Sequence, residues 1–349
     1  MDLLTVTDRG LYCAAGDFFI DPWRPVSRAV ITHAHADHAR AGMGRYVCAA
    51  PGVGVLQTRV GRDAVIQGVP YGQTLTIGPV KITLFPAGHV LGSAQVRVEH
   101  RGMVWVASGD YKTAIDPTCA TFEPVRCQVF ITESTFGLPI YRWQPPERIF
   151  DQINQWWAEN QAEGRTSVLF GYSLGKAQRL LAGVDASLGP ILVHSAIMPL
   201  VEQYRLQGVR LPLVEQITTD LAKQHQGRAL VVAPPAADVD SWLRKFGESS
   251  TAAASGWMQI RGARRRQTHD RGFVLSDHAD WEGLISSIRA TGAERVLVTH
   301  GYTATLTRYL NECGIPAQVL PLRGFAATAE DAALEGAAVE STADLSNVD

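Results

Sequence analysis

The sequence predicts an α/β protein in which one α/β unit is inserted into another. The first part of the chain contains short strand-like runs separated by Gly and Pro, and from Thr166 short strands alternate with helices. After about Arg271 short strands return. Because strand–helix alternation is typical of a parallel sheet covered by helices, the middle part forms a unit of its own and the last part completes the first.

Strands in the first part are indicated by alternation and by apolar runs. Val80–Phe85 alternates apolar and polar residues, as a half-buried strand does. Ala94–Glu99 and Met103–Ala107 flank His100–Gly102, which is typical of a hairpin turn. Val129–Ile131 is a further buried run. We expect these segments to be strands and the helices to come later in the chain.

The middle part begins with a helix from Pro146 to about Glu163, in which Ile149, Ile153 and Trp157 recur at helical spacing as core residues. The elements expected after it are strand 167–170, helix 175–184, strand 191–193, helix 196–207, a polar helix and strand 230–232. Strands 273–275 and 296–298 then return to the first unit. The tail from about residue 328 is rich in Ala, Glu and Asp, so we expect it to be disordered or loosely helical.

Composition places the chain among ordinary globular proteins. It has 349 residues, of which 46% are hydrophobic and 19% charged, enough for two domains. No run of about 18 apolar residues spans a membrane, and the N-terminus lacks the pattern of a secretory signal. The five cysteines form no C-x-x-C pair, which favours a reduced, cytoplasmic compartment. The net charge of −2 decides little about a nucleic-acid partner.

The run His33-Ala34-His35-Ala36-Asp37-His38 directly follows the apolar segment Ala29–Ile31. Neutral imidazoles and a carboxylate are ligands that zinc and similar ions prefer. His33 and His35 can leave a strand end on one side, whereas Asp37 and His38 fall past it and can face a second ion. The run therefore predicts ligands for two metals. The alternative is a solvated His-rich loop, which the preceding buried strand disfavours.

Further ligand-type residues follow other predicted strands, namely His89, Asp110, His300 and Asp21. Each alone is a weak signal, but together with the histidine run they suffice for two zinc-like ions. Asp110 is the natural bridge, because a carboxylate can give one oxygen to each metal. Two ions about 3.5–4 Å apart can share a water, lower its pKa and neutralise the oxygens of a phosphodiester under attack.

The HxHxDH run followed by His89, Asp110 and a distant His300 resembles the metallo-β-lactamase superfamily. That resemblance implies an αβ/βα sandwich with the metals at one edge. It implies a first ion held by His33, His35 and His89, a second held by Asp37, His38 and His300, and a bridge at Asp110. Asp37 is expected to serve catalysis as well as metal binding, and Asp21 to hold a ligand histidine by its other ring nitrogen. The ions are expected to be zinc, with manganese as the alternative.

Four segments resemble the β-CASP branch, which acts on nucleic acids, namely Thr132–Gly137, Tyr172–Gln178, Leu275–Asp280 and Thr299–Gly301. The resemblance makes Glu133, His278 and His300 motifs A, B and C, and it implies a metallo-β-lactamase αβ/βα sandwich with an inserted β-CASP α/β domain. The expected domains are 1–137 with 271–327, then 138–270, followed by a flexible tail at 328–349.

Physical reasoning gives His278 and Glu133 the same roles. Hydrolysis of a phosphodiester expels an alkoxide, so a proton donor near the leaving oxygen helps. A histidine can donate near neutral pH when a carboxylate fixes its tautomer and raises its pKa. The alternatives are a structural histidine and a surface carboxylate. A small-molecule hydrolase such as a thioesterase would need neither this pair nor the insert.

Contacts to nucleic acid are predicted at two places. Ser173 and Lys176 lie where a helix begins, so its amides and the ammonium could hold a phosphate, although Gly171 and Gly175 fit simple turn residues equally well. Arg264, Arg265 and Arg266 belong to the strongest positive cluster of the chain and could follow a phosphate backbone. A solvated loop is the competing interpretation of this cluster.

The segment Leu11–Trp23, the length and the lack of an added RNA-binding domain resemble bacterial ligase-associated DNA exonucleases over about residues 3 to 325. The resemblance implies a metal-dependent exonuclease that hydrolyses DNA in repair, beside an ATP-dependent DNA ligase and a helicase. His300 at motif C instead favours an RNA-processing β-CASP ribonuclease, which is the alternative. Polarity, exonuclease against endonuclease action and oligomeric state stay open.

Overall fold

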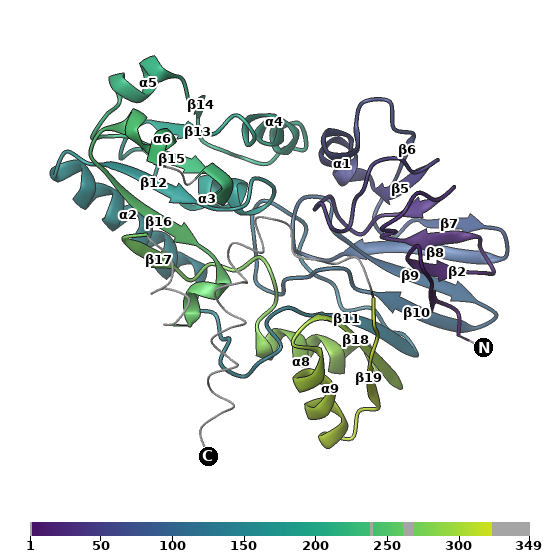
Figure 1. Cartoon of the computed structure of the whole chain (residues 1–349). Helices are drawn as coiled ribbons and strands as arrows, with labels where there is room; N and C mark the ends of the chain where they lie inside the picture. The colour runs from purple at the N-terminus through teal and green to yellow at the C-terminus, as the bar shows by residue number, and fades with distance from the viewer. Residues whose placement is uncertain (1, 238–239, 261–268, 323–349) are drawn as a thin grey trace. The chain divides into compact units, whose positions relative to one another are not determined.

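The computed structural model describes residues 2–237, 240–260 and 269–322 and divides the chain into two compact units (Figure 1). The first unit comprises residues 2–142 and 277–322, and the second comprises the described residues of 143–276. The domain boundaries expected from the sequence, after residues 137 and 270, fall a few residues before these limits. The expected tail at 328–349 lies outside the described residues.

Two sheets form the centre of the first unit. One has the order β1-β2-β3-β4-β5-β6, and the other has the order β19-β18-β11-β10-β9-β8-β7. The strands of the first sheet are β1 (Thr5–Val6), β2 (Leu11–Cys13), β3 (Phe18–Ile20), β4 (Ala29–Val30), β5 (Tyr46–Ala49) and β6 (Ile66–Val69). The strands of the second are β7 (Thr74–Ile77), β8 (Val80–Pro86), β9 (Ala94–His100), β10 (Met103–Ala107), β11 (Val129–Ser134), β18 (Arg295–Gly301) and β19 (Ala317–Val319).

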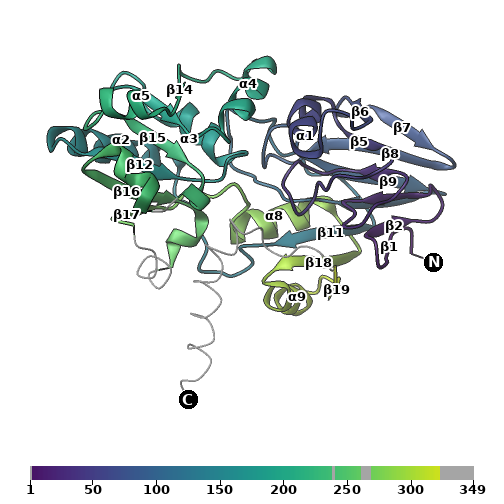
Figure 2. The same cartoon turned by 45° about the horizontal axis from the view of Figure 1, so that its top comes forward.

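The two sheets of the first unit pack face to face, and helices lie outside them (Figures 1 and 2). One apolar cluster joins side chains of both sheets, such as Phe18 and Val96. A second cluster joins β10, β11 and β18 to the helices α8 (Trp281–Thr291) and α9 (Thr303–Glu312). A short 3₁₀ turn η1 (Ala50–Gly52) leads into α1 (Val53–Val60), which packs beside β6. The first unit is therefore a mixed α/β structure of two sheets between helices.

Strand β11 is the central element of the second sheet. It lies between β10 and β18 and pairs in parallel with both. All six of its residues are buried, as expected for a strand covered on both faces. Because parallel strands bring their carboxyl ends to one edge, β10, β11 and β18 present the residues that follow or end them side by side.

The second unit contains one parallel sheet with helices on both faces. Its order is β14-β13-β15-β12-β16-β17. One apolar cluster joins the sheet to α2, α3 and α4, and another joins it to α5 and the 3₁₀ turns. The strands are β12 (Thr166–Phe170), β13 (Ile191–Val193), β14 (Glu215–Gln216), β15 (Leu230–Ala233), β16 (Ser249–Ala254) and β17 (Arg271–Phe273). The helices are α2 (Pro146–Ala162), α3 (Lys176–Gly183), α4 (Met198–Leu206), α5 (Thr219–Gln224) and α6 (Asp240–Leu243), with 3₁₀ turns η2 (Pro235–Ala237), η3 (Arg244–Phe246) and η4 (Gly256–Gln259).

Three differences from the sequence-based elements concern α1, β16 and β17, and short strands such as β14 also have no expected counterpart. Helix α1 lies in the first part of the chain, where only strands are expected, because its buried Val55, Leu56 and Val60 compensate for a composition that favours helix weakly. Strand β16 has no signal in the sequence, since Ser, Thr and Ala favour strands weakly, yet it pairs with both β12 and β17. Strand β17 covers Arg271–Phe273 rather than residues 273–275, and it pairs with β16 in the second unit, whereas the sequence predicts a return to the first unit there.

Candidate active site

The candidate site of the first unit is assembled from the ends of strands. The histidine run follows β4, His89 follows β8 and Asp110 follows β10, while His300 is the last residue but one of β18. Glu133 lies in β11. The parallel registers of β10, β11 and β18 align these ends, so residues far apart in sequence meet at one edge.

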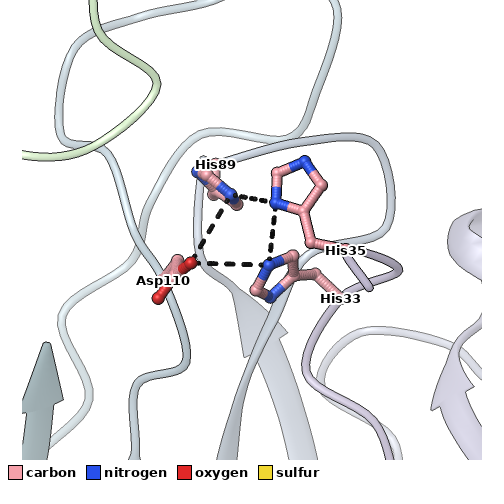
Figure 3. A group of neighbouring side chains, drawn as sticks. All are labelled: His33, His35, His89 and Asp110. Carbon is pink, nitrogen blue, oxygen red and sulfur yellow. Dashed lines mark hydrogen bonds and ion pairs between the residues drawn. The ribbon is translucent and has the colours of Figure 1, made fainter. Parts of the chain in front are cut away.

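Four side chains of the first cluster point toward a common centre (Figure 3). His35 Nδ1 lies 3.1 Å from His33 Nε2 and 3.1 Å from His89 Nε2. The fourth member of the cluster is Asp110, whose Oδ2 lies 3.5 Å from His33 Nε2 and 3.9 Å from His89 Nε2. Three ring nitrogens and one carboxylate oxygen around one point are the donor set that zinc prefers.

A second cluster contains Asp37, His38 and His300. His38 Nε2 lies 3.5 Å from Asp37 Oδ2 and 3.4 Å from Asp110 Oδ2. His300 Nδ1 lies 3.6 Å from the other oxygen of Asp110. Asp110 is thus within reach of both clusters, which is the position that a bridging carboxylate requires.

The donor atoms of Asp110 fit a cation between the clusters. The side chain is buried, and among the residues that the structure describes its Oδ1 atom has no hydrogen-bond partner. A buried carboxylate oxygen without a donor is costly unless a cation occupies its free lone pairs. Burial alone would raise the pKa of Asp110, but the imidazoles of His38, His300 and His33 hold that pKa well below its usual range.

Hydrogen bonds to Nδ1 orient three of the histidines. His38 Nδ1 lies 2.7 Å from Asp21 Oδ2, and His89 Nδ1 lies 2.7 Å from the carbonyl oxygen of Asp277. His33 Nδ1 lies 3.1 Å from the hydroxyl of Thr32. With the proton of each ring on Nδ1, His33 and His89 present a bare Nε2 to the centre, as a metal ligand must, and His38 does so once it has lost its second proton.

Burial keeps two of the histidines neutral. It lowers the pKa of His33 and of His89 well below the ordinary value, and neighbouring imidazoles add to the effect. For His38 burial also lowers the pKa, but Asp37, Asp110 and Asp21 outweigh it and raise the pKa well above the ordinary value. The two clusters therefore differ in charge, because the second is surrounded by more carboxylate.

His278 and Glu133 form a third group beside the same carboxylate. His278 Nδ1 lies 3.0 and 2.9 Å from the two oxygens of Glu133, and donor atoms of both residues lie within 4.8 Å of Asp110. Glu133 also accepts a 2.7 Å hydrogen bond from the amide of Tyr111. Burial lowers the pKa of His278, but the carboxylates of Glu133, Asp110 and Asp277 together outweigh it and raise the pKa to about 9. The imidazole is thus a cation at neutral pH, with a second proton on Nε2.

The backbone at two site residues adopts a conformation that side chains rarely take. Asp21 has φ +43° and His300 has φ +58°. Such conformations outside Gly cost free energy and cluster at functional sites. Asp21 uses this conformation to accept from both the amide (2.8 Å) and the hydroxyl (2.5 Å) of Thr32 while holding His38.

Sequence reasoning missed three residues that support the site. The hydroxyl of Thr32 bonds both Asp21 and His33, and the only feature of the sequence that could have indicated this role is its place directly before His33. Gly109 has φ +56°, and a Cβ there would lie 2.6 Å from Thr32 Cβ, so only Gly allows this approach. Asp277 acts through its backbone carbonyl, which no side-chain pattern reveals.

The predicted nucleic-acid contacts have mixed outcomes. Lys176 is buried, and its ammonium donates to the carbonyl of Leu275. That burial contradicts the expected phosphate contact, because the ammonium donates to a carbonyl inside the second unit and does not face solvent. Ser173 is half-buried just before α3, and its carbonyl accepts from Gln178. Arg264, Arg265 and Arg266 lie outside the described residues.

Comparison with known proteins gives two kinds of relative. The chain is 31% identical over 311 residues to a probable DNA ligase of Opitutus terrae, a match that covers 88% of this chain and 30% of that protein. It is 30% identical over 122 residues to the endoribonuclease YSH1 of Kluyveromyces lactis, covering 34% of this chain and 16% of that protein. The chain thus spans less than a third of the length of either relative. Similarity to nucleases of this kind supports the β-CASP family predicted from the motifs.

A solved structure shares the fold. The protein of unknown function from Enterococcus faecalis V583 superposes with a TM-score of 0.59 at 13% identity, over 85% of this chain and 80% of that chain. No model of a known protein family matches the chain. Among the described residues, none of the helices combines the length and the apolar character needed to cross a bilayer.

Proposed function

We propose that this protein is a metal-dependent nuclease that hydrolyses phosphodiester bonds. The observation that carries the proposal is the sharing of Asp110 by three groups of side chains. Two of these groups have the donors of a metal site, and the third is a histidine held by a buried glutamate. A two-metal centre beside a cationic histidine is what phosphodiester hydrolysis needs.

The donors fit two divalent ions, zinc first and manganese as the alternative. His33, His35 and His89 would hold one ion, Asp37, His38 and His300 the other, with Asp110 between them. When bound, two such ions supply a water of lowered pKa and neutralise charge on the phosphoryl oxygens. The protein orients two of the ligand nitrogens through hydrogen bonds: His38 Nδ1 donates to the carboxylate of Asp21, and His89 Nδ1 donates to the carbonyl of Asp277.

His278 is proposed as the general acid. Its Nδ1 proton is shared with Glu133, which fixes the ring and leaves the Nε2 proton for the leaving oxygen. Glu133 in turn is held by the amide of Tyr111, so its carboxylate cannot turn away. Asp37 would contribute negative charge beside His38 and His300.

We propose DNA as the substrate and exonucleolytic repair as the role, with an ATP-dependent DNA ligase and a helicase as functional partners. Similarity over 88% of the chain to a probable DNA ligase supports this link. The alternative is an RNA-processing β-CASP ribonuclease, which similarity to endoribonucleases supports over a shorter stretch. We propose the first unit as the metallo-β-lactamase domain, the second as the β-CASP domain, and the cytoplasm as the location.

Digestion of matched nucleic acids tests the proposal. Linear end-labelled and circular single-stranded DNA and RNA of equal length are incubated with the protein at one salt concentration, with zinc or with manganese. We expect shortening of linear DNA from an end and intact circles. Faster RNA cleavage would favour the ribonuclease, and cut circles would overturn the exonuclease assignment.

A pair of histidine variants distinguishes the activity of this site from that of a contaminating nuclease. His35→Ala removes a proposed ligand of the first cluster, whereas His100→Ala removes a histidine of the β9–β10 hairpin, whose Nδ1 lies 3.2 Å from the carbonyl oxygen of Pro79. We expect His100→Ala to cleave like the wild type and His35→Ala to be inactive. Equal cleavage by both variants would refute the proposed metal-dependent mechanism.

A further inference from the structure

Lys112 is a buried cation directly behind the site. It lies two residues after Asp110, and its residue exposure is 1%. Lysines are almost never fully buried unless a partner compensates the lost hydration. No motif in the sequence predicts a role for this residue, so its contacts indicate what it does.

The ammonium of Lys112 reaches three acceptors. Its Nζ lies 2.5 Å from Asp116 Oδ2, 3.5 Å from the carbonyl oxygen of His89 and 3.9 Å from Asp277 Oδ1. The other oxygen of Asp116 accepts from the amide and hydroxyl of Thr118, at 2.8 and 2.6 Å. Lys112 is therefore fixed by Asp116 on one side and touches two further residues on the other.

Those two further residues are the partners of one hydrogen bond. His89 donates from Nδ1 to the carbonyl of Asp277 at 2.7 Å, the bond that leaves His89 Nε2 bare. Lys112 lies near the carbonyl oxygen of His89 and the side-chain oxygen of Asp277, so a single cation interacts with both residues that form this bond. The residue after Asp277 is His278.

Backbone hydrogen bonds bring the same three segments together. The amide of Lys112 donates to Ala87 at 3.0 Å, and the amide of Ala279 donates to Tyr111 at 2.7 Å. At Gly88 a Cβ would lie 2.3 Å from the Lys112 carbonyl oxygen, so the segments are in close contact. The Lys112 side chain adds a charge at the point where these bonds converge.

Stability alone is a weak reason for this arrangement. A buried ion pair often contributes no more than well-packed apolar residues of the same volume, because both ions lose their hydration. Its directional contacts instead restrict where His89 and Asp277 lie. Restricting the partners of ligand histidines affects metal sites strongly, since removal of such partners costs about 10–100-fold in affinity or activity.

We propose that Lys112 is a positioning residue that holds the His89–Asp277 hydrogen bond, and with it the Nε2 ligand atom of His89 and the start of the His278 segment. It acts through these residues and does not itself touch a metal or a substrate. The inference rests on the proposed metal site, but its main readout is made on the protein without metal.

The test compares two variants that differ only in the ammonium. Asp116→Asn keeps an amide oxygen for the Lys112 ammonium, and the carboxylate of Asp277 stays 3.9 Å from it, whereas Lys112→Met with Asp116→Asn removes the cation together with the carboxylate that faces it. Because Lys112→Met alone would take the ammonium away from a buried carboxylate, the double variant is the one expected to fold. Lys81→Met, on the surface of the second sheet, controls for the loss of one lysine.

Histidine ¹⁵N NMR of the metal-free proteins reports the His89 tautomer. We expect the Nδ1-protonated tautomer in the wild type, Asp116→Asn and Lys81→Met, and a mixture of tautomers in the double variant. Metal titration should show about tenfold weaker binding of one ion in the double variant only. An unchanged tautomer and unchanged affinity in the folded double variant would overturn the inference. Wild-type nuclease activity, measured separately, tests the proposed function independently.

Discussion

The charge of Glu133 determines the protonation of His278, so Glu133→Gln is the most informative substitution at this site. The variant keeps the size of the side chain and an oxygen acceptor, but it removes the negative charge 2.9 Å from His278 Nδ1. The pKa of His278 is about 9 with the carboxylate present. Without it, burial lowers the pKa and the remaining carboxylates of Asp110 and Asp277 raise it, so the pKa should approach the ordinary value of a histidine.

The size of the effect follows from these two values. The pKa of His278 should fall from about 9 toward the ordinary 6.5, a change of about 2.5 units, or about 3 kcal/mol in favour of the neutral ring. At about pH 8 roughly nine tenths of the wild-type His278 carries the acidic proton, against roughly 3% in the variant. If His278 is the acid, turnover at that pH falls about thirtyfold from protonation alone.

The assay is the pH dependence of kcat on an oligonucleotide at saturating substrate and metal, from about pH 6 to about pH 9.5. Activity of the wild type should decline only as the pH rises through about 9, and in Glu133→Gln the decline should begin at least about two units lower. Glu99→Gln, a partly exposed glutamate of β9 paired with Arg97, is the matched control. If the alkaline limb keeps its position in Glu133→Gln while metal content is unchanged, His278 is not the acid.

Other consequences of the site can be measured directly. His35→Ala or Asp37→Ala should reduce cleavage to background while shifting Tm by only a few degrees, and retained nuclease activity in either would contradict the ligand assignment. Asp21→Asn should weaken binding of the ion at His38 by about 10–100-fold in a metal titration, and unchanged affinity would show that Asp21 does not orient that ring. Because the pKa of His278 is raised in the folded protein, its ion pair with Glu133 stabilises the fold fully below about pH 6.5, and this contribution is lost as the pH rises through about 9. The free energies of unfolding in urea of the metal-free wild type and His278→Gln should therefore converge over that range. A difference in unfolding free energy that stays constant with pH would refute this linkage.

The proposed ligand residues were predictable because most of them follow a recognisable strand. An apolar run that ends in a histidine or aspartate, as at Asp110 and His89, gives both the residue and its place at a sheet edge. The parallel registers of β10, β11 and β18 then explain why ends separated by many residues coincide. The pairing of Glu133 with His278 was expected from the chemistry of a proton donor, and the structure brings the two within hydrogen-bond distance.

The supporting residues were not predictable, because they act through geometry that no local pattern encodes. Lys112 and Asp116 look like surface charges in the sequence, yet the fold buries both. Lys176 was misjudged in the opposite direction. A lysine at a helix start predicts a phosphate contact, whereas its ammonium donates to the carbonyl of Leu275. Strand β16 was missed because pairing with two neighbours, rather than its composition, makes it a strand.

The burial of β11 has a consequence for hydrogen exchange. Residues Val129–Ile131 of β11 pair with both β10 and β18, whereas Glu133 lies beyond the pairs with β10 and at the register shift against β18. Backbone amides that are buried and paired on both edges exchange with solvent only when a whole cooperative unit opens. We therefore expect slow exchange at Val129–Ile131 and faster exchange at Glu133. A variant that frees Glu133 should lose protection at the end of β11 first, while the paired part of the sheet stays protected, so that damage to the acid pair can be detected apart from loss of the sheet.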